Sequence, residues 1–246
     1  RDQPRSRGLG DVYKRQLFML CDHLWATLFP AQEWMTCVGR LAFPIFAFMI
    51  AEGCYYTSNV KKYMLRLFLF AIISEIPFNL IMGSSVFYPF HQNVLWTFLL
   101  GVLSIQIIEK AKKKQKKWIS FFVVCLVLLM DFLLGTITMV DYNAAGILTV
   151  LLFYFFRKKT WISFAAQLVG LYYLNVVMLG NLYYPVTILG HHFEIAQQSF
   201  ALLALIPIWL YHGEQGYHNK WFKYFCYAFY PVHLLILFVI WQWRIW

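Results

Sequence analysis

Residues 118–138 read WISFFVVCLVLLMDFLLGTIT, and this run of 21 residues contains a single ionisable side chain, Asp131. A helix needs about 20 apolar residues to cross the hydrocarbon core of a bilayer. The rest of the chain has the same character, because 61% of its 246 residues are hydrophobic and only 13% are charged. Soluble domains are roughly 25% charged. The composition therefore excludes a soluble domain and indicates an integral membrane protein.

Eight further apolar segments accompany residues 118–138. They lie near residues 17–30, 34–53, 62–82, 92–109, 143–157, 161–179, 197–211 and 221–243. Several are shorter than ~20 residues, so we expect these helices to extend into adjacent polar sequence or to lie in thinned bilayer. Strand alternation with a period of two residues is absent. We predict an all-α, polytopic bundle of about nine transmembrane helices that forms a single domain over residues 17–246.

The first 16 residues differ from everything that follows. They read RDQPRSRGLGDVYKRQ, a polar and basic string with a net charge of +3, and the apolar character begins at Leu17. The string resembles the translated leader of a sequencing adapter. We therefore expect residues 1–16 to be non-native and the first helix to lack its cytoplasmic turn.

Basic residues follow each even-numbered apolar segment, whereas the stretches after segments one, three, five and seven contain no Lys or Arg. These basic residues are Lys61, Lys62, Arg66, Lys110, Lys112, Lys113, Lys114, Lys116, Lys117, Arg157, Lys158, Lys159, Lys220 and Lys223. The excess of Lys and Arg in cytoplasmic loops predicts a cytoplasmic N-terminus and an external C-terminus. The run of lysines at residues 110–117 is accordingly expected to set topology and not to bind nucleic acid.

Ionisable residues within membrane spans are costly and usually face the interior of the bundle. His23, Arg40 and Glu75 belong to the first three spans, each roughly 9–11 Å below the predicted outer surface at 1.5 Å per residue. A common depth predicts one cluster. The alternatives are that Arg40 pairs with Glu75 as structural glue and that Asp22 with His23 only locks helix packing.

Asp22 and His23 point about 100° apart on a helix, so they are not expected to meet at one point. Asp22 is expected to bond a neighbouring helix or a polar group that orients the ring of His23. More polar residues fall on the predicted outer side, where they would line a pocket: Asn79, His91, Asn93, Asp141 and Tyr142. His233 is expected in the inner half, in contact with a cofactor or packed in the core. His191, His192 and Glu194 form a weak pattern, and no metal site is expected.

The order of several sequence blocks resembles the TraX family of membrane proteins. The blocks include LFMLCDHLWATLFP at 17–30, GRLAFPIFAFMIAEGCYYTSN at 39–59, KKYMLRLFLFAIISEIPFNL at 61–80, DYNAAGILTVLLFY at 141–154 and KYFCYAFYPVHLLIL at 223–237. Members of this family are linked to N-terminal acetylation of conjugative pilin. The family is also distantly similar to integral-membrane acyltransferases that carry a histidine in their first helix, which here implies His23.

The resemblance implies an integral-membrane acetyltransferase that moves an acetyl group from acetyl-CoA to an amine or hydroxyl of a protein or cell-surface acceptor. It also implies a location in the bacterial inner membrane and assigns the role of the catalytic histidine to His23. Compatible roles for its neighbours are that Asp22 or Glu75 fixes the tautomer of His23 and that Arg40 stabilises an oxyanion or binds the acceptor. Lys61, Lys62 and Arg66 are expected to meet coenzyme A phosphates.

Two other functions remain open at this point. One is a small-molecule or proton-coupled transporter built around Asp22, His23, Arg40 and Glu75, which predicts a repeat between halves of the chain. No clear repeat is visible. The other is a structural membrane subunit, which predicts that the polar cluster tolerates apolar replacement.

Overall fold

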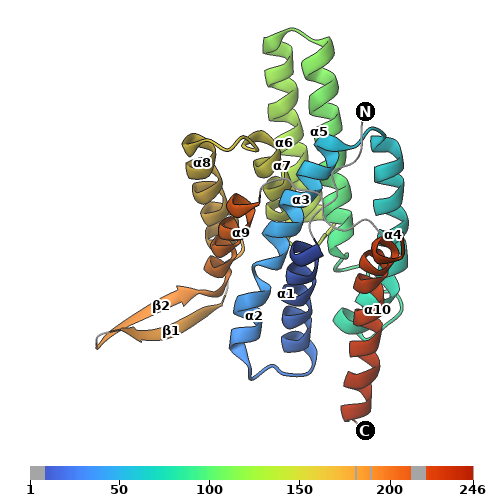
Figure 1. The fold of residues 1–246 in the computed structure, drawn as a ribbon, viewed down its shortest axis with the longest axis vertical. Coiled ribbons are helices and arrows are strands. Elements are labelled where there is room, and N and C mark those ends of the chain that lie inside the picture. Colours follow the sequence, from blue (N-terminus) through green and yellow to red (C-terminus); the bar gives the residue numbers. More distant parts are fainter. Residues whose placement is uncertain (1–8, 181, 189, 212–219, 246) are drawn as a thin grey trace. The chain divides into compact units, whose positions relative to one another are not determined.

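The computed structural model describes residues 9–180, 182–188, 190–211 and 220–245, and most of these are helical (Figure 1). The chain forms two compact units, which we describe one at a time. Unit 1 comprises chiefly residues 47–157, and unit 2 comprises residues 5–46 with residues 158–246.

Unit 1 is a helical bundle with a short helix at its centre. Its elements are the second part of α3 (Ala42–Tyr56), α4 (Val60–Gly83), α5 (Val94–Lys114), α6 (Lys117–Ile137) and α7 (Asn143–Phe155). The α5, α6 and α7 helices pack on one another, and α4 packs on α5. Most side chains of α7 are buried. A Cβ on Gly135 of α6 would lie only 2.6 Å from the Cα of Ala144, so this glycine permits the close approach of α6 to α7.

Two opposite faces of α6 explain its place in the bundle. Its buried residues are Ser120, Val127, Asp131 and Gly135, which recur at helical spacing. Large apolar side chains on the other face, such as Phe121 and Ile137, are exposed. A helix that is apolar outside and small or polar inside is typical of a membrane bundle, where lipid covers the outer face.

Unit 2 combines an early and a late part of the chain. Its elements are α1 (Leu9–Thr27), α2 (Glu33–Gly39), the first part of α3, α8 (Trp161–Leu171), the π-helical η1 (Tyr172–Met178), β1 (Tyr183–Ile188), β2 (His191–Ala196), the 3₁₀-helical η2 (Gln197–Ala204), α9 (Leu205–Leu210) and α10 (Lys220–Ile245). The α1 helix packs on α2 and α10, and η2 packs on α2 and η1. The α1 helix begins inside the stretch that the sequence set apart as a leader.

A break at Arg40–Leu41 divides the predicted span 34–53 into α2 and α3. Pro44, in the first turn of α3, has no backbone N–H, and its ring would clash with the carbonyl of Arg40 if one regular helix continued through this point. The first turn of a helix tolerates proline, so α3 begins just before it. The break leaves Arg40 at the junction of two helices.

The β1–β2 hairpin was not expected, since the predicted fold is all-α and these residues lie between the predicted segments 161–179 and 197–211. The strands pair antiparallel from Tyr183↔Ala196 to Ile188↔His191. Gly190 in the connecting turn has a φ of +83°, which favours glycine. Aromatic and β-branched residues dominate β1, and β2 contributes Phe193 and Ile195, which favours this conformation.

Within the described residues, six helices are long and apolar enough to cross a membrane. They cover Glu33–Tyr56, Val60–Gly83, Val94–Lys114, Lys117–Ile137, Trp161–Met178 and Phe225–Arg244. The predicted spans 143–157 and 197–211 correspond to shorter apolar helices, and 17–30 corresponds to part of α1. Six spans are thus supported, and the total of about nine stays a prediction.

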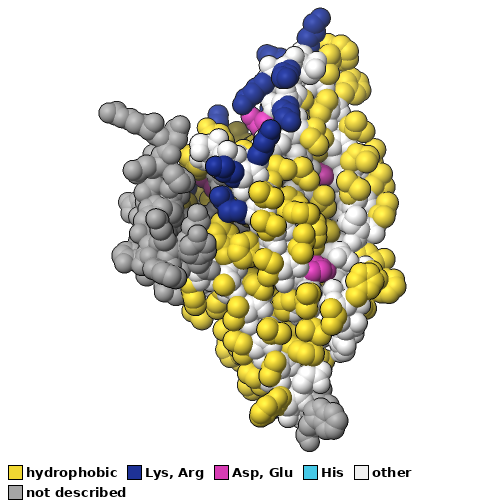
Figure 2. Space-filling model, turned by 90° about the vertical axis from the view of Figure 1, so that its right-hand side faces the viewer, with side chains coloured by type: hydrophobic (Ala, Val, Ile, Leu, Met, Phe, Trp, Pro, Cys, Tyr) yellow, Lys and Arg dark blue, Asp and Glu magenta, His cyan; other side chains and the backbone are white. Residues whose placement is uncertain are grey.

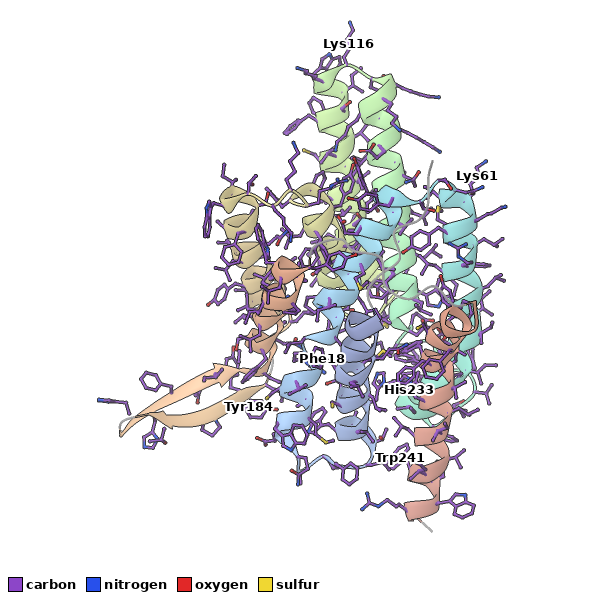
Figure 3. The ribbon with its side chains drawn as sticks, in the orientation of Figure 1. Phe18, Lys61, Lys116, Tyr184, His233 and Trp241 are labelled. Atoms are coloured by element: carbon purple, nitrogen blue, oxygen red, sulfur yellow. The ribbon has the colours of Figure 1, made fainter. Side chains whose placement is uncertain are left out.

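Basic residues gather at one end of unit 1. Successive helices run antiparallel, so this end contains the starts of α4 and α6 and the ends of α5 and α7. Lys61 and Lys116 mark it in Figure 3. Figure 2 shows Lys and Arg side chains gathered together above a face covered by hydrophobic side chains. The segments at the opposite end, residues 84–93 and 138–142, contain no Lys or Arg.

Candidate functional site

Two histidines from distant parts of the chain meet in unit 2. His23 Nδ1 of α1 lies 2.7 Å from His233 Nε2 of α10, and the two ring centroids are 4.9 Å apart with an angle of 17° between the ring planes. His233 is only 6% exposed, and its Nδ1 lies 2.6 Å from the carbonyl oxygen of Phe229. The sequence left open whether His233 contacts a cofactor or packs in the core, and the structure places its ring against His23.

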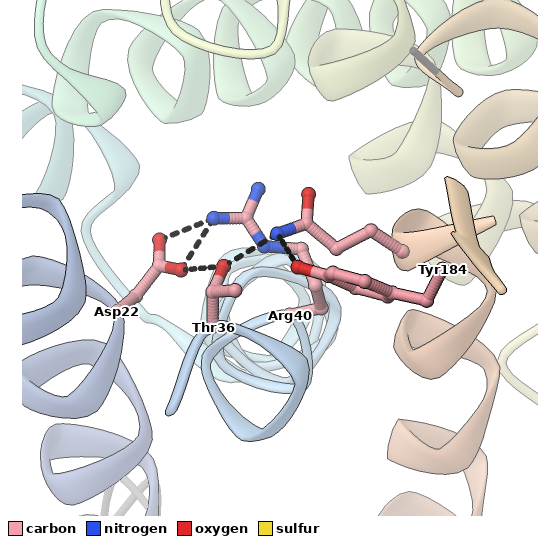
Figure 4. Close-up of polar contacts among 5 residues, drawn as sticks. Asp22, Thr36, Arg40 and Tyr184 are labelled. Atoms are coloured by element: carbon pink, nitrogen blue, oxygen red, sulfur yellow. Dashed lines mark hydrogen bonds and ion pairs between the residues drawn. The ribbon is translucent and has the colours of Figure 1, made fainter. Parts of the chain in front are cut away.

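Asp22 points to a different neighbour from His23, as the helical geometry predicted. Its carboxylate accepts hydrogen bonds from Nη2 of Arg40 and, at 2.8 Å, from Oγ1 of Thr36 (Figure 4). Gly39 makes this contact possible, because a Cβ there would lie 2.5 Å from the Cβ of Asp22. The structure shows an ion pair of Arg40 with Asp22. The alternative pairing of Arg40 with Glu75 stays a prediction.

The Asp22 network continues into the hairpin. Gln197 Nε2 donates to Thr36 Oγ1 at 2.9 Å and to Tyr184 Oη at 3.1 Å. Burial raises the pKa of Tyr184 above its ordinary value, so its hydroxyl stays neutral. Gln197 therefore donates to Thr36, and Thr36 donates to the Asp22 carboxylate. Together with Tyr184, these hydrogen bonds connect α1, α2, η2 and β1.

Glu75 belongs to unit 1, where its partners come from the start of α5. One carboxylate oxygen accepts from Asn93 Nδ2 and, at 2.9 Å, from Trp96 Nε1. Asn93 also accepts from the backbone N–H of Leu95 at 3.0 Å and so caps α5. The other oxygen of Glu75 is buried and has no hydrogen-bond partner within the described residues. Within unit 1 the described partners of Glu75 are thus Asn93 and Trp96. The single cluster of His23, Arg40 and Glu75 stays a prediction.

A second polar group of unit 1 connects the segment before α5, residues 84–93, with the segment before α7, residues 138–142. His91 Nε2 lies 3.3 Å from Asp141 Oδ1, and the Asp141 carbonyl accepts from Thr97 Oγ1 at 2.6 Å. The hydrogen bond to Asp141 raises the pKa of His91 above 6.5. Tyr142 adopts a left-handed conformation just before α7, and Asn79 donates to the carbonyl of Val86 at 3.2 Å. These four predicted residues, His91, Asp141, Tyr142 and Asn79, therefore shape the segments between helices.

The basic end of unit 1 contains a third polar group. Arg157 lies over the ring of Tyr55, 3.1 Å from its centroid. Tyr154 donates a hydrogen bond to Glu109, and Lys112 lies 3.8 Å from Glu109. Lys61 and Lys62 are exposed at the start of α4.

The sequence analysis missed several members of these groups because it considered chiefly ionisable residues. Thr36, Gln197 and Tyr184 are uncharged, yet they complete the Asp22 network. Asp131, which had no obvious partner in the sequence, accepts from Ser104 Oγ at 2.6 Å. A search for Thr, Gln and Ser at the starts or buried faces of the predicted spans would have found Thr36, Gln197 and Ser104 but not Tyr184.

Known proteins resemble this chain over nearly its whole length. A probable fimbrial assembly protein, FimC of serogroup H1 from Dichelobacter nodosus, is 26% identical over 229 residues, which cover 90% of this chain and 86% of the relative. No solved structure matches the chain significantly. The profile of the TraX protein family matches residues 16–241, which include the histidine pair and the whole Asp22 network. The chain therefore belongs to the TraX family.

Proposed function

We propose that this protein is a membrane-embedded acetyltransferase of pilus or fimbrial assembly. Family membership and the name of the fimbrial relative support the process. The observation that carries the reaction is His23, a histidine of α1 whose ring is held by a second ring from α10. An imidazole titrates near neutral pH and is the commonest general base in enzymes.

The proposed reaction needs one group that takes a proton and returns it. The acceptor nitrogen or oxygen attacks the carbonyl carbon of the acetyl thioester while His23 removes the proton of the acceptor. The carbon–sulfur bond then breaks, and the imidazolium of His23 protonates the departing thiolate. Arg40 is proposed to stabilise negative charge near this centre while its ion pair with Asp22 fixes its position.

The proposed acyl donor is acetyl-CoA, which carries several phosphate groups. Nε of Arg66 and Nη1 of Arg157 are buried donors that lack a hydrogen-bond partner within the described part of the chain. Lys61 and Lys62 are exposed at the same end of unit 1. Guanidinium donors and ammonium groups suit phosphate oxygens, so this end fits a phosphate-bearing donor.

The proposed location is the bacterial inner membrane, with the basic end of unit 1 in the cytoplasm. The six apolar helices support membrane insertion, and the placement of Lys and Arg supports this orientation. The lipid bilayer, acetyl-CoA and a protein or cell-surface acceptor are then the partners.

The test compares cells that contain the wild-type protein with cells that contain His23→Ala at equal abundance in the membrane. We expect mass spectrometry of pilins and surface glycans to show an acetyl group that is lost by about 100-fold or more in the variant. His192→Ala, which changes an exposed histidine of the hairpin, is the matched control and should retain acetylation. Undiminished acetylation in His23→Ala would overturn the assignment.

A transporter gives the opposite pattern of results. Uptake of a substrate into liposomes in the absence of acetyl-CoA, with no acetylated product in cells, would replace the proposed reaction with transport. Acetylation that needs His23 but no uptake supports the transferase.

A further inference from the structure

Three groups form a chain of contacts around His233. The carbonyl oxygen of Phe229 lies 2.6 Å from His233 Nδ1, and His233 Nε2 lies 2.7 Å from His23 Nδ1. The ring of His233 also stacks on Phe229, with centroids 4.8 Å apart and 22° between the planes. A buried ring that is held on both edges and on one face has little freedom to rotate or flip.

The carbonyl of Phe229 determines which ring nitrogens of His233 and His23 carry a hydrogen. A carbonyl oxygen only accepts hydrogen bonds, so His233 Nδ1 carries a hydrogen. A neutral imidazole has one N–H, so His233 Nε2 has a lone pair and accepts. His23 Nδ1 must then be the donor. In neutral His23 the second nitrogen, Nε2, consequently carries the lone pair.

We propose that His233 is a positioning residue that holds His23 in the tautomer with the hydrogen on Nδ1, so that Nε2 is the basic atom. This inference rests on the proposed function for the role of His23 and extends it to the reacting atom. The sequence analysis expected a carboxylate, Asp22 or Glu75, to fix this tautomer. The described partners of these carboxylates lie on α2 and on α5, whereas the described partner of His23 Nδ1 is the ring of His233.

A neutral ring differs from a carboxylate in one chemical respect. When His23 Nε2 takes a proton, the resulting imidazolium still donates from Nδ1 to the lone pair of His233, so the hydrogen bond is kept and strengthened. His233 adds no negative charge to the site. The pair therefore orients the base without the charge that a buried carboxylate brings to an apolar bundle.

The first measurement is independent of any activity. The protein is labelled with ¹⁵N-histidine, purified in detergent at neutral pH, and the resonances of His23 are identified by their loss in His23→Gln. We expect Nδ1 of His23 to appear protonated and Nε2 unprotonated. In His233→Phe, which keeps a flat ring of similar size, we expect His23 to shift towards the opposite tautomer.

Two variants separate tautomer control from packing. In His233→Gln the side-chain carbonyl still accepts from His23, so the tautomer and most of the activity should be retained. Phe229→Leu removes the stacked ring but keeps the backbone carbonyl, and it should leave the tautomer unchanged. If His233→Phe does not fold, the comparison of His233→Gln with His233→Leu replaces it.

Acetyl transfer supplies the second measurement. His233→Phe should lower kcat by about 100-fold or more, as expected for a base in the wrong tautomer, with little change in KM for acetyl-CoA. An unchanged tautomer of His23 in both His233→Phe and His233→Leu would overturn the inference. A wild-type protein that shows the expected tautomer but transfers no acetyl group would instead refute the proposed function alone.

Discussion

Asp22 and His23 are adjacent in the chain, yet their side chains interact with different helices. The Asp22 carboxylate binds α2 through Arg40 and Thr36, and the His23 ring binds α10 through His233. The angle of about 100° between successive residues of a helix predicted this separation. The identity of the partners was not predictable, because Thr36 and His233 lie 14 and 210 residues away along the chain.

The first prediction concerns the Asp22–Arg40 ion pair, whose side chains are 19% and 14% exposed. Asp22→Asn and Arg40→Gln should each destabilise the protein, since each leaves the other charge largely desolvated. The double variant should lose less than the sum of the two, with a coupling of about 1–3 kcal/mol in the free energy of unfolding measured in detergent.

The pair Glu109–Lys112 is a suitable control for this cycle. Its charged groups lie 3.8 Å apart and are more exposed, at 37% and 44%. Its coupling should not exceed about 1 kcal/mol. Effects of Asp22→Asn and Arg40→Gln that simply add would mean that the ion pair contributes nothing beyond its separate groups.

At the scale of the elements, the short helix α7 shows that the length and the burial of an apolar segment must be considered together. The α7 helix has 13 residues, so it rises only about 20 Å, and α5 and α6 pack against it. The sequence explained short spans by helix extension or bilayer thinning. In the structure, most side chains of α7 are buried against other helices. This burial depends on contacts between distant segments, which a hydropathy profile does not report.

The contact between His91 and Asp141 gives a prediction about the segments between helices. The hydrogen bond that His91 donates to Asp141 raises the pKa of His91 above its ordinary value of 6.5, so the folded state binds the proton more tightly than the unfolded state. The contact should therefore stabilise unit 1 fully below pH 6.5. This stabilisation should be lost as the pH rises through the raised pKa.

Thermal unfolding in detergent at a series of pH values tests this dependence. The difference in Tm between the wild-type protein and His91→Gln should be largest below pH 6.5 and should shrink as the pH rises. His191→Gln, at an exposed position of the hairpin, should show no such trend. A difference for His91→Gln that stays constant from acid to alkaline pH would contradict the role of the charged contact.

At the scale of the whole molecule, the distribution of charge predicts how the chain lies in the membrane. The helices of unit 1 place Lys61 and the lysines of residues 110–117 at one end. The α4 helix of 24 residues rises about 36 Å, enough to cross a hydrocarbon core of about 30 Å. The two ends of unit 1 should therefore face opposite sides of the membrane.

Cysteine labelling tests this orientation in a variant whose five native cysteines are replaced by serine. With a membrane-impermeant maleimide, Ser85→Cys should react in intact spheroplasts, and Lys116→Cys should react only after permeabilisation. Phe122→Cys, on the exposed apolar face of α6, should resist the reagent in both cases because lipid covers it. Labelling of Lys116→Cys in intact spheroplasts would reverse the proposed orientation.

The sequence by itself determined the membrane class, the helical character and the placement of the basic segments. These properties follow from local composition, because the hydropathy and the Lys and Arg content of a segment do not depend on contacts with distant segments. It also located the apolar helical segments, although it missed the β1–β2 hairpin in a region where local strand propensity was already visible.

Only the tertiary structure decided which polar groups meet. His23 pairs with His233, Arg40 with Asp22, and Glu75 with Asn93 and Trp96. A common depth along the helix axes places residues at one level but not on one face. The rotation of each helix and its choice of neighbour decide which side chains touch, and both depend on packing between segments far apart in the chain.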